Sequence, residues 1–125
     1  MGGTVVDLND PLVFMHRAVR PDSLCCETVG LWLEQRGVVQ PYSRRRQAAL
    51  WVRLGAFRAA VAAAERIGLK RIHGGCARTG DVVLFQQAGG ITVGLCFNGL
   101  ALAAAGGKVV IHKAPFLAAW KAPSL

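Results

Sequence analysis

One cysteine of this sequence has the placement of an enzymatic nucleophile. Cys25 follows Asp22-Ser23, a pair that can cap a helix, so it lies in the first turn of a helix predicted over about 24–36. The unpaired N–H groups and the positive dipole end of a helix stabilise a thiolate, the reactive form of cysteine. Two features favour a structural thiol instead: the charge of Glu27 raises the pKa of a nearby thiol, and Cys25 falls on the apolar stripe of its helix. On these residues alone, the structural role is the more favoured of the two.

A cysteine nucleophile also needs a base that takes its proton. The sequence holds three histidines. His112 lies on a strand predicted over 109–113, where an imidazole can be held in position, whereas His73 lies in a Gly-rich loop and His16 on the polar side of the first helix. His112 is therefore the candidate base of an active protein, although a single histidine on a strand is more often a packed or surface residue.

The four cysteines do not have the spacing of a metal site or a disulfide framework. No C-x-x-C pair is present, and the adjacent Cys25 and Cys26 point in different directions on any regular element. Cys96 lies in an apolar run, where a free thiol behaves as a small hydrophobe. We expect free thiols in a reducing assembly compartment, with no metal and no cofactor.

Helices are expected in the first half of the chain. Helical spacing of apolar residues, together with cap and stop residues, predicts four of them. Asp10-Pro11 opens the first, Ser43 caps the third, and Gly55 separates the third from the fourth. Their expected ranges are about 10–20, 24–36, 44–54 and 56–67.

After Gly68 the pattern changes to short apolar segments separated by turn signals. Asn98-Gly99 is a typical type I′ hairpin turn, and the tail is expected to form a last turn that packs Phe116 and Trp120. The expected strands cover 69–72, 81–86, 91–97, 100–104 and 109–113.

This order predicts one α+β domain over 1–125, with helices packed on an antiparallel sheet of about four to five strands. Its helical part spans about 10–68, its β-meander about 69–113 and its tail 114–125.

Composition excludes several classes of protein. Hydrophobic residues make up 53% of the 125 residues, which excludes an intrinsically disordered chain. No apolar run approaches the roughly 18–20 residues of a membrane span, and the first residues lack the basic and apolar regions of a secretion signal. A net charge of +8 favours anionic partners, although an Arg-rich composition without functional meaning explains it equally well. Aromatic residues are only 7%, which counts against a nucleic-acid groove.

The order of these parts resembles that of the NlpC-type, papain-like cysteine peptidases. The resemblance rests on a cysteine at a helix start, the run Gly80–Phe85 and the Val-Gly-Leu of Val93–Leu95. More closely, the sequence resembles a small group of proteins encoded among the tail genes of phages and prophages, whose pattern is similar to Asp-Cys-Cys, a Trp about two helical turns later, and then Gly. The residues that fit this group, over nearly the whole chain, are Cys25-Cys26, Trp32, Gly37, Tyr42, Ala48-Ala49-Leu50, Gly55, Gly80-Asp81-Val82-Val83 and Ala119-Trp120.

The resemblance assigns the nucleophile position to Cys25, with the adjacent Cys26 as the alternative. It also implies a base and an orienting group that this sequence does not supply. In active NlpC-type enzymes a His begins the strand that reads His-Val-Gly, and Thr92 stands there in this chain. An Asp commonly precedes the nucleophile, where this chain has Leu24, and the strand expected to carry the third polar residue, 100–104, is wholly apolar. Because threonine cannot act as a general base near neutral pH, the resemblance implies a peptidase scaffold that has lost its chemistry.

We therefore expect a structural protein of a phage virion, either a component of the tail tip or baseplate or a tail-assembly factor, present in the host cytoplasm during assembly. Its partners would be other tail proteins, with an acidic surface facing Arg44, Arg45 and Arg46, although a solvated surface explains this run equally well. The alternative is an active peptidoglycan endopeptidase with Cys25 as nucleophile and His112 or His73 as base. A more remote alternative, based on the charge, is a nucleic-acid-binding protein whose affinity falls steeply with salt.

Overall fold

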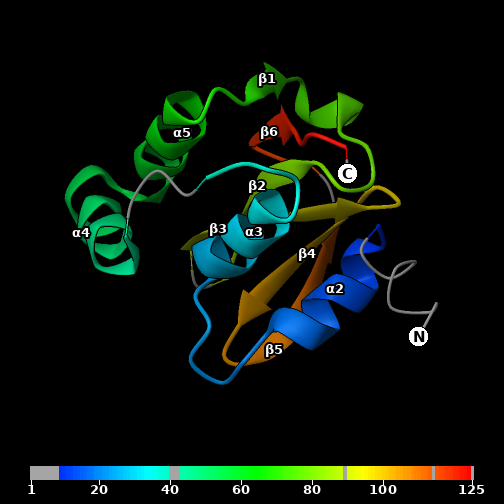
Figure 1. The fold of residues 1–125 in the computed structure, drawn as a ribbon, viewed down its shortest axis with the longest axis horizontal. Coiled ribbons are helices and arrows are strands. Elements are labelled where there is room, and N and C mark those ends of the chain that lie inside the picture. Colours follow the sequence, from blue (N-terminus) through cyan, green and yellow to red (C-terminus); the bar gives the residue numbers. More distant parts are fainter. Residues whose placement is uncertain (1–8, 40–42, 89, 114, 125) are drawn as a thin grey trace.

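The computed structural model describes residues 9–39, 43–88, 90–113 and 115–124, apart from the side chain of Arg44. The N-terminal segment over 1–8 and Tyr42, both used in the sequence analysis, lie outside the described residues. Within the described part, four helices precede six strands, so the predicted α+β class is confirmed (Figure 1). The helices are α2 (Pro11–Ala18), α3 (Cys25–Glu34), α4 (Arg44–Leu54) and α5 (Ala56–Arg66). The strands are β1 (Lys70–Ile72), β2 (Val82–Gln87), β3 (Gly90–Phe97), β4 (Leu100–Ala105), β5 (Lys108–Lys113) and β6 (Ala118–Lys121), with a 3-10 turn η1 (Gly74–Cys76) after β1.

The helices begin where side chains can satisfy their unpaired N–H groups. Asp10 accepts hydrogen bonds from two backbone N–H groups at the start of α2, and Ser43 accepts one of 3.2 Å at the start of α4. α3 begins differently, because Leu24 precedes it: the carboxylate of Glu27 reaches back and accepts a 2.9 Å hydrogen bond from the N–H of Leu24. Gly55, with a φ of 85°, ends α4 and begins α5.

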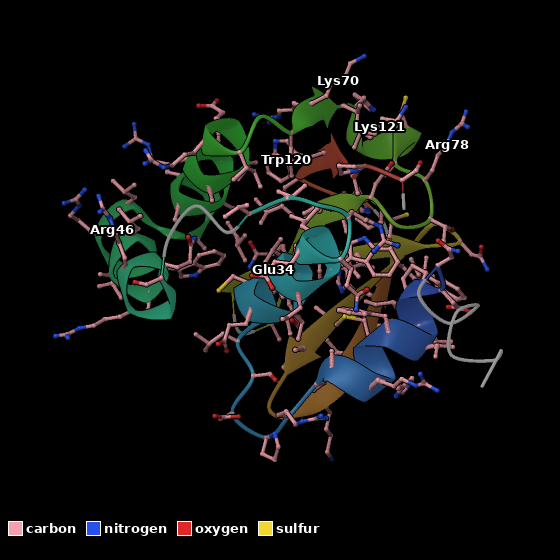
Figure 2. All side chains as sticks on the ribbon, in the orientation of Figure 1. Glu34, Arg46, Lys70, Arg78, Trp120 and Lys121 are labelled. Carbon is pink, nitrogen blue, oxygen red and sulfur yellow. The ribbon has the colours of Figure 1, made fainter. Side chains whose placement is uncertain are left out.

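In the described chain, all six strands join one antiparallel sheet in the order β1-β6-β2-β3-β4-β5. The sequence predicts about four to five strands and a terminal turn, and both predictions are wrong: residues 118–121 form β6, which lies between β1 and β2. Ala119 pairs with Ile72 on one side and with Val83 on the other. This strand escapes prediction because it is short and begins with two alanines, a residue type that is depleted in strands. Trp120 is buried, as expected, and Figure 2 shows it inside the fold while the Arg46, Lys70 and Arg78 side chains extend outward.

Apolar residues are buried on both faces of the sheet. α2 and α3 cover the face that we call the helix face, whose buried sheet residues are Val82, Leu84, Val93, Leu95, Leu102, Ala104, Ala118 and Trp120. The opposite face, which we call the back face, buries Val83, Phe85, Cys96, Ala101, Ala103 and Ala119. Because β4 is buried on both faces, its sequence is a continuous apolar run rather than an alternation.

Trp32 connects α3 to the start of β2. Its side chain is 1% exposed, and its indole N–H donates a 2.9 Å hydrogen bond to the carbonyl oxygen of Gly80. Phe14 of α2 contacts the ring edge-on, with ring centroids 5.2 Å apart, and the guanidinium of Arg36 lies 3.3 Å from the ring centroid. Gly80 has a φ of 97°, and a Cβ there would lie 3.3 Å from the Trp32 ring, so this position requires glycine. Trp32 and Gly80, two of the motif residues, are thus a structural pair.

We predict that Trp32→Phe lowers the free energy of unfolding by about 3 kcal/mol, because it leaves the buried Gly80 carbonyl without its donor and opens a cavity. Trp51→Phe is the matched control, since Trp51 is only half-buried and its indole N–H makes no hydrogen bond within the described residues. Urea unfolding followed by circular dichroism measures both variants. Equal losses in the two variants would contradict the role assigned to the Trp32 indole.

Candidate functional site

Cys25 is the first residue of α3, and its half-buried side chain lies against β3. Burial raises the pKa of its thiol; hydrogen bonding from the backbone of Val93 and from the first turn of α3 opposes this rise but does not outweigh it. The thiol is therefore protonated near neutral pH, which is its unreactive form. The position at a helix start is present, but the activation expected of a nucleophile is not.

Cys26 is also half-buried, and its pKa is raised to about 11, first by burial and then by the negative charges of Cys25 and Glu27. The charge of Glu27, which the sequence analysis expects to act on Cys25, thus acts on the neighbouring thiol in the structure. Neither cysteine at the start of α3 is an activated thiolate.

The structure does not bring the candidate bases to Cys25. His112 lies on the back face of the sheet, where its ring stacks on Phe85 with centroids 4.9 Å apart and an interplanar angle of 23°. His73 is exposed beyond β1, and its Nδ1 accepts a hydrogen bond from a backbone N–H of η1 at 3.0 Å. His16 is exposed on α2, as its pattern predicts. Among the described residues, no imidazole contributes to the pKa of Cys25.

Thr92, the position at which the resemblance places a base, also lies on the back face. Successive residues of a strand point to opposite faces, and its neighbour Val93 is buried in the helix face. Thr92 pairs with Phe85 across the β2–β3 ladder, and its hydroxyl donates a 3.0 Å hydrogen bond to the side-chain oxygen of Gln87. An imidazole at this position would therefore point away from α3 and from the sulfur of Cys25.

Asp81 and Gly94, which belong to the motifs behind the resemblance, have structural roles. The buried carboxylate of Asp81 accepts hydrogen bonds from the N–H groups of Arg78 (2.9 Å) and Ala122 (3.1 Å), so it joins the turn before β2 to the end of β6. Gly94 leaves room for β4, because a Cβ there would overlap the carbonyl oxygen of Leu102. Sequence reasoning assigns Asp81 no role, although Gly-Asp just before a strand is a signal for a side chain that binds turn N–H groups.

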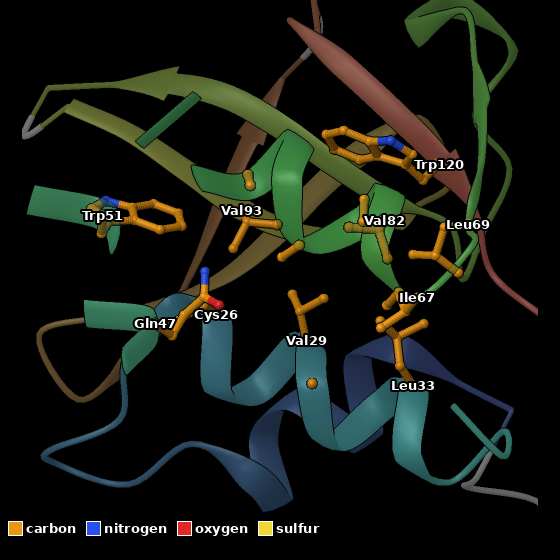
Figure 3. Close-up of a pocket in the computed structure, with 14 residues that line it drawn as sticks. Cys26, Val29, Leu33, Gln47, Trp51, Ile67, Leu69, Val82, Val93 and Trp120 are labelled. Carbon is orange, nitrogen blue, oxygen red and sulfur yellow. The ribbon is translucent and has the colours of Figure 1, made fainter. Parts of the chain in front are cut away.

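A cavity of about 70 Å³ lies between α3, α4, α5 and the helix face (Figure 3). Cys26 of α3 and Gln47 and Trp51 of α4 line one side of it, and most of the remaining lining is apolar. Gln47 is only 8% exposed, and within the described residues its side-chain amide has no hydrogen-bond partner. Figure 3 shows this amide directed into the cavity beside Cys26. Sequence reasoning misses Gln47 because it follows an arginine run on a helix whose other described side chains are half-buried or exposed.

The polar groups described at this end of the molecule are two thiols, one carboxamide and backbone N–H groups. Within the described residues, no group of three His, Cys, Asp or Glu side chains could hold a metal ion. No helix among them is long and apolar enough to cross a membrane. Two protonated thiols, one carboxamide and backbone N–H groups can accept and donate hydrogen bonds, but none of them can take a proton from a nucleophile at neutral pH.

Most of the chain matches one protein-family model, a domain of unknown function, DUF6950, over residues 25–122. The chain belongs to the DUF6950 family. The match begins at Cys25, the first residue of α3, and ends at Ala122, whose N–H the Asp81 carboxylate binds. The matched residues thus include β6 and both residues of the Asp81–Ala122 hydrogen bond. No curated protein and no solved structure matches this DUF6950 domain.

We predict that Cys25 and Cys26 react with iodoacetamide more slowly than the exposed Cys76 at every pH from about 6 to 9, because burial keeps both thiols protonated. Their rates should keep rising above about pH 9 instead of levelling off there, the direction that a raised thiol pKa requires. Alkylation at a series of pH values, quantified peptide by peptide by mass spectrometry, measures this. A Cys25 rate that exceeds that of Cys76 and falls on acidification through about pH 6–7 would show an activated nucleophile instead.

Proposed function

We propose that this DUF6950 domain is a non-catalytic docking component of a phage tail, in the tail tip or baseplate or acting during tail assembly. Its scaffold, in this proposal, is that of an NlpC-type cysteine peptidase that has lost its chemistry. The observation that carries the proposal is the environment of Cys25: a half-buried, protonated thiol on the helix face, with His112 on the other face of the sheet. The order of motifs resembling tail-gene proteins supports the location.

Loss of the base removes most of the catalytic power of such a site. A cysteine peptidase needs an imidazole that takes the thiol proton and returns it to the leaving amine. Removing one member of such a unit costs several orders of magnitude in rate, and the remaining groups then contribute little beyond binding. The position of Thr92 on the back face supports this reading, because no single substitution there would supply a base to Cys25.

The surface of α4 supports a docking role. Arg45 and Arg46 are exposed in its first turn, and Val52 is 88% exposed. Cations in the first turn of a helix oppose its dipole, so the charge of Arg45 is locally unfavourable. An acidic surface on a neighbouring tail protein would offset that cost and cover Val52. The proposed partners are therefore other tail proteins, and the proposed location is the virion, with the host cytoplasm during assembly.

One observation favours the alternative, a peptidoglycan endopeptidase. The sulfur of Cys25 lies beside backbone groups of Val93 and of the first turn of α3, and such N–H groups could stabilise an oxyanion. In that case the domain would need a base from outside its described residues. The two functions differ in whether muropeptides are cleaved.

We predict that the purified protein does not cleave muropeptides between about pH 5 and 9, because no imidazole of the described residues lies beside Cys25 to activate it. Liquid chromatography with mass spectrometry compares it with Cys25→Ala, and we expect identical product profiles. Cleavage that disappears in Cys25→Ala would establish the endopeptidase instead.

We predict that the double variant Arg45→Glu/Arg46→Glu reduces recovery of the protein in phage particles released from induced host cells by about tenfold, because it reverses the charge of the proposed docking surface. Arg78→Glu/Lys108→Glu is the matched control, with the same change of charge at exposed positions away from α4. Quantitative immunoblotting of purified particles measures recovery. Absence of the wild-type protein from particles and from assembly intermediates would contradict the tail role, and equal losses in both variants would contradict docking through α4.

A further inference from the structure

The cavity between α3, α4 and α5 is accessible from the surface. Five of the residues that line it are partly exposed, so it is not sealed: Cys26, Trp51, Ala63, Ile67 and Leu69. Its volume of about 70 Å³ is about half of the ~150 Å³ that accommodates benzene. It is therefore sized for an alkyl group of about three carbons, such as the side chain of valine.

Gln47 gives the cavity its polar specificity. Its side chain is more than nine-tenths buried, with 8% exposed, and its amide is directed into the cavity without a hydrogen-bond partner among the described residues (Figure 3). The amide atoms are accessible to water through the cavity, since no buried side-chain nitrogen or oxygen of the described residues lacks a partner. A ligand that replaces this water with matched hydrogen bonds can therefore pair with the amide. A carboxamide offers both a donor and an acceptor, which are the two groups that pair with the C=O and the N–H of a peptide unit. The complementary ligand therefore has a small alkyl group next to an amide.

We infer that this cavity binds a neutral peptide segment, which inserts a valine-sized side chain and pairs its backbone amide with Gln47. The described residues that line the cavity include no Asp, Glu, Lys, Arg or His, so a charged group would enter it without a counterion. The apolar walls, formed by residues such as Val29, Leu33 and Val93, provide the contact for the alkyl group. That the segment belongs to a neighbouring protein rests on the proposed docking function.

The test uses the full chain, labelled with ¹⁵N, and N-acetyl-L-valine methylamide as the probe. We expect shifts of the Gln47 side-chain NH₂ and the Trp51 indole N–H that saturate with a dissociation constant on the order of 1 mM. N-acetylglycine methylamide, which lacks the alkyl group, and 2-methylpropan-1-ol, which lacks the amide, should bind at least about tenfold more weakly. The absence of a saturable shift, or equal affinity for all three probes, would overturn the inference.

Two variants of the cavity are compared with one control. Gln47→Met keeps the shape of the side chain but removes the amide, and it should weaken binding of the valine probe about tenfold. Ala63→Leu fills the cavity and should abolish binding, so the test remains decisive if Gln47→Met does not fold. Gln35→Met, an exposed position at the end of α3, should leave the affinity unchanged. Wild-type affinity in either folded cavity variant would refute the proposed site.

The outcome is separable from that of the proposed function. If the protein binds the probe saturably but is absent from phage particles, the proposed tail role is wrong and the proposed peptide site is supported. If the probe does not bind but Arg45→Glu/Arg46→Glu lowers recovery in particles, the proposed peptide site is wrong and docking through α4 is supported.

Discussion

The arrangement of α3 on the sheet depends on the buried hydrogen bond from the Trp32 indole N–H to the Gly80 carbonyl oxygen. It joins residues that are 48 positions apart and fixes α3 over the point where β2 begins. Asp81, the next residue, holds the end of β6 through the N–H of Ala122. One turn of the chain therefore positions a helix and two neighbouring strands at once. Because α3 is fixed in this way, Cys25 at its start lies against β3.

The fixed position of α3 limits the chemistry that is open to Cys25. The sulfur of Cys25 lies against Val93 of β3, whose side chain is buried in the helix face. Burial at this position favours the neutral form of the thiol. The polar groups that could act on it lie on the other side of a sheet that is buried on both faces. Moving His112 or Thr92 to the sulfur would require a shift of strand register, which would turn every side chain of that strand to the opposite face of the sheet. The chemistry of the site is therefore limited by the packing of the sheet rather than by one missing side chain.

Much of the fold follows from local signals in the sequence. Asp10, Ser43 and Gly55 mark helix boundaries because each acts within a few residues of its own position. Asn98-Gly99 marks the β3–β4 turn in the same way, with a positive φ at both residues. The features that sequence reasoning misses depend on distant partners: two alanines become part of a strand only because β1 and β2 flank them, and Gln47 becomes a cavity residue only because α4 packs beside α5. The face on which Thr92 lies is likewise set by strand register, which the order of motifs does not fix.

The place of β6 in the sheet also determines when the fold can be completed in a cell. Strands β2 to β5 form successive hairpins and can pair as they leave the ribosome. In the described sheet β1 pairs only with β6, so Arg71 of β1 cannot form its strand pairing until Trp120 has been synthesised. Until then, the free edge of β2 presents unpaired backbone groups beside apolar side chains, and such an edge is open to strands from other chains. The nascent protein is therefore exposed to aggregation until its last strand emerges, and a chaperone that shields β2 during translation would increase the yield of folded protein.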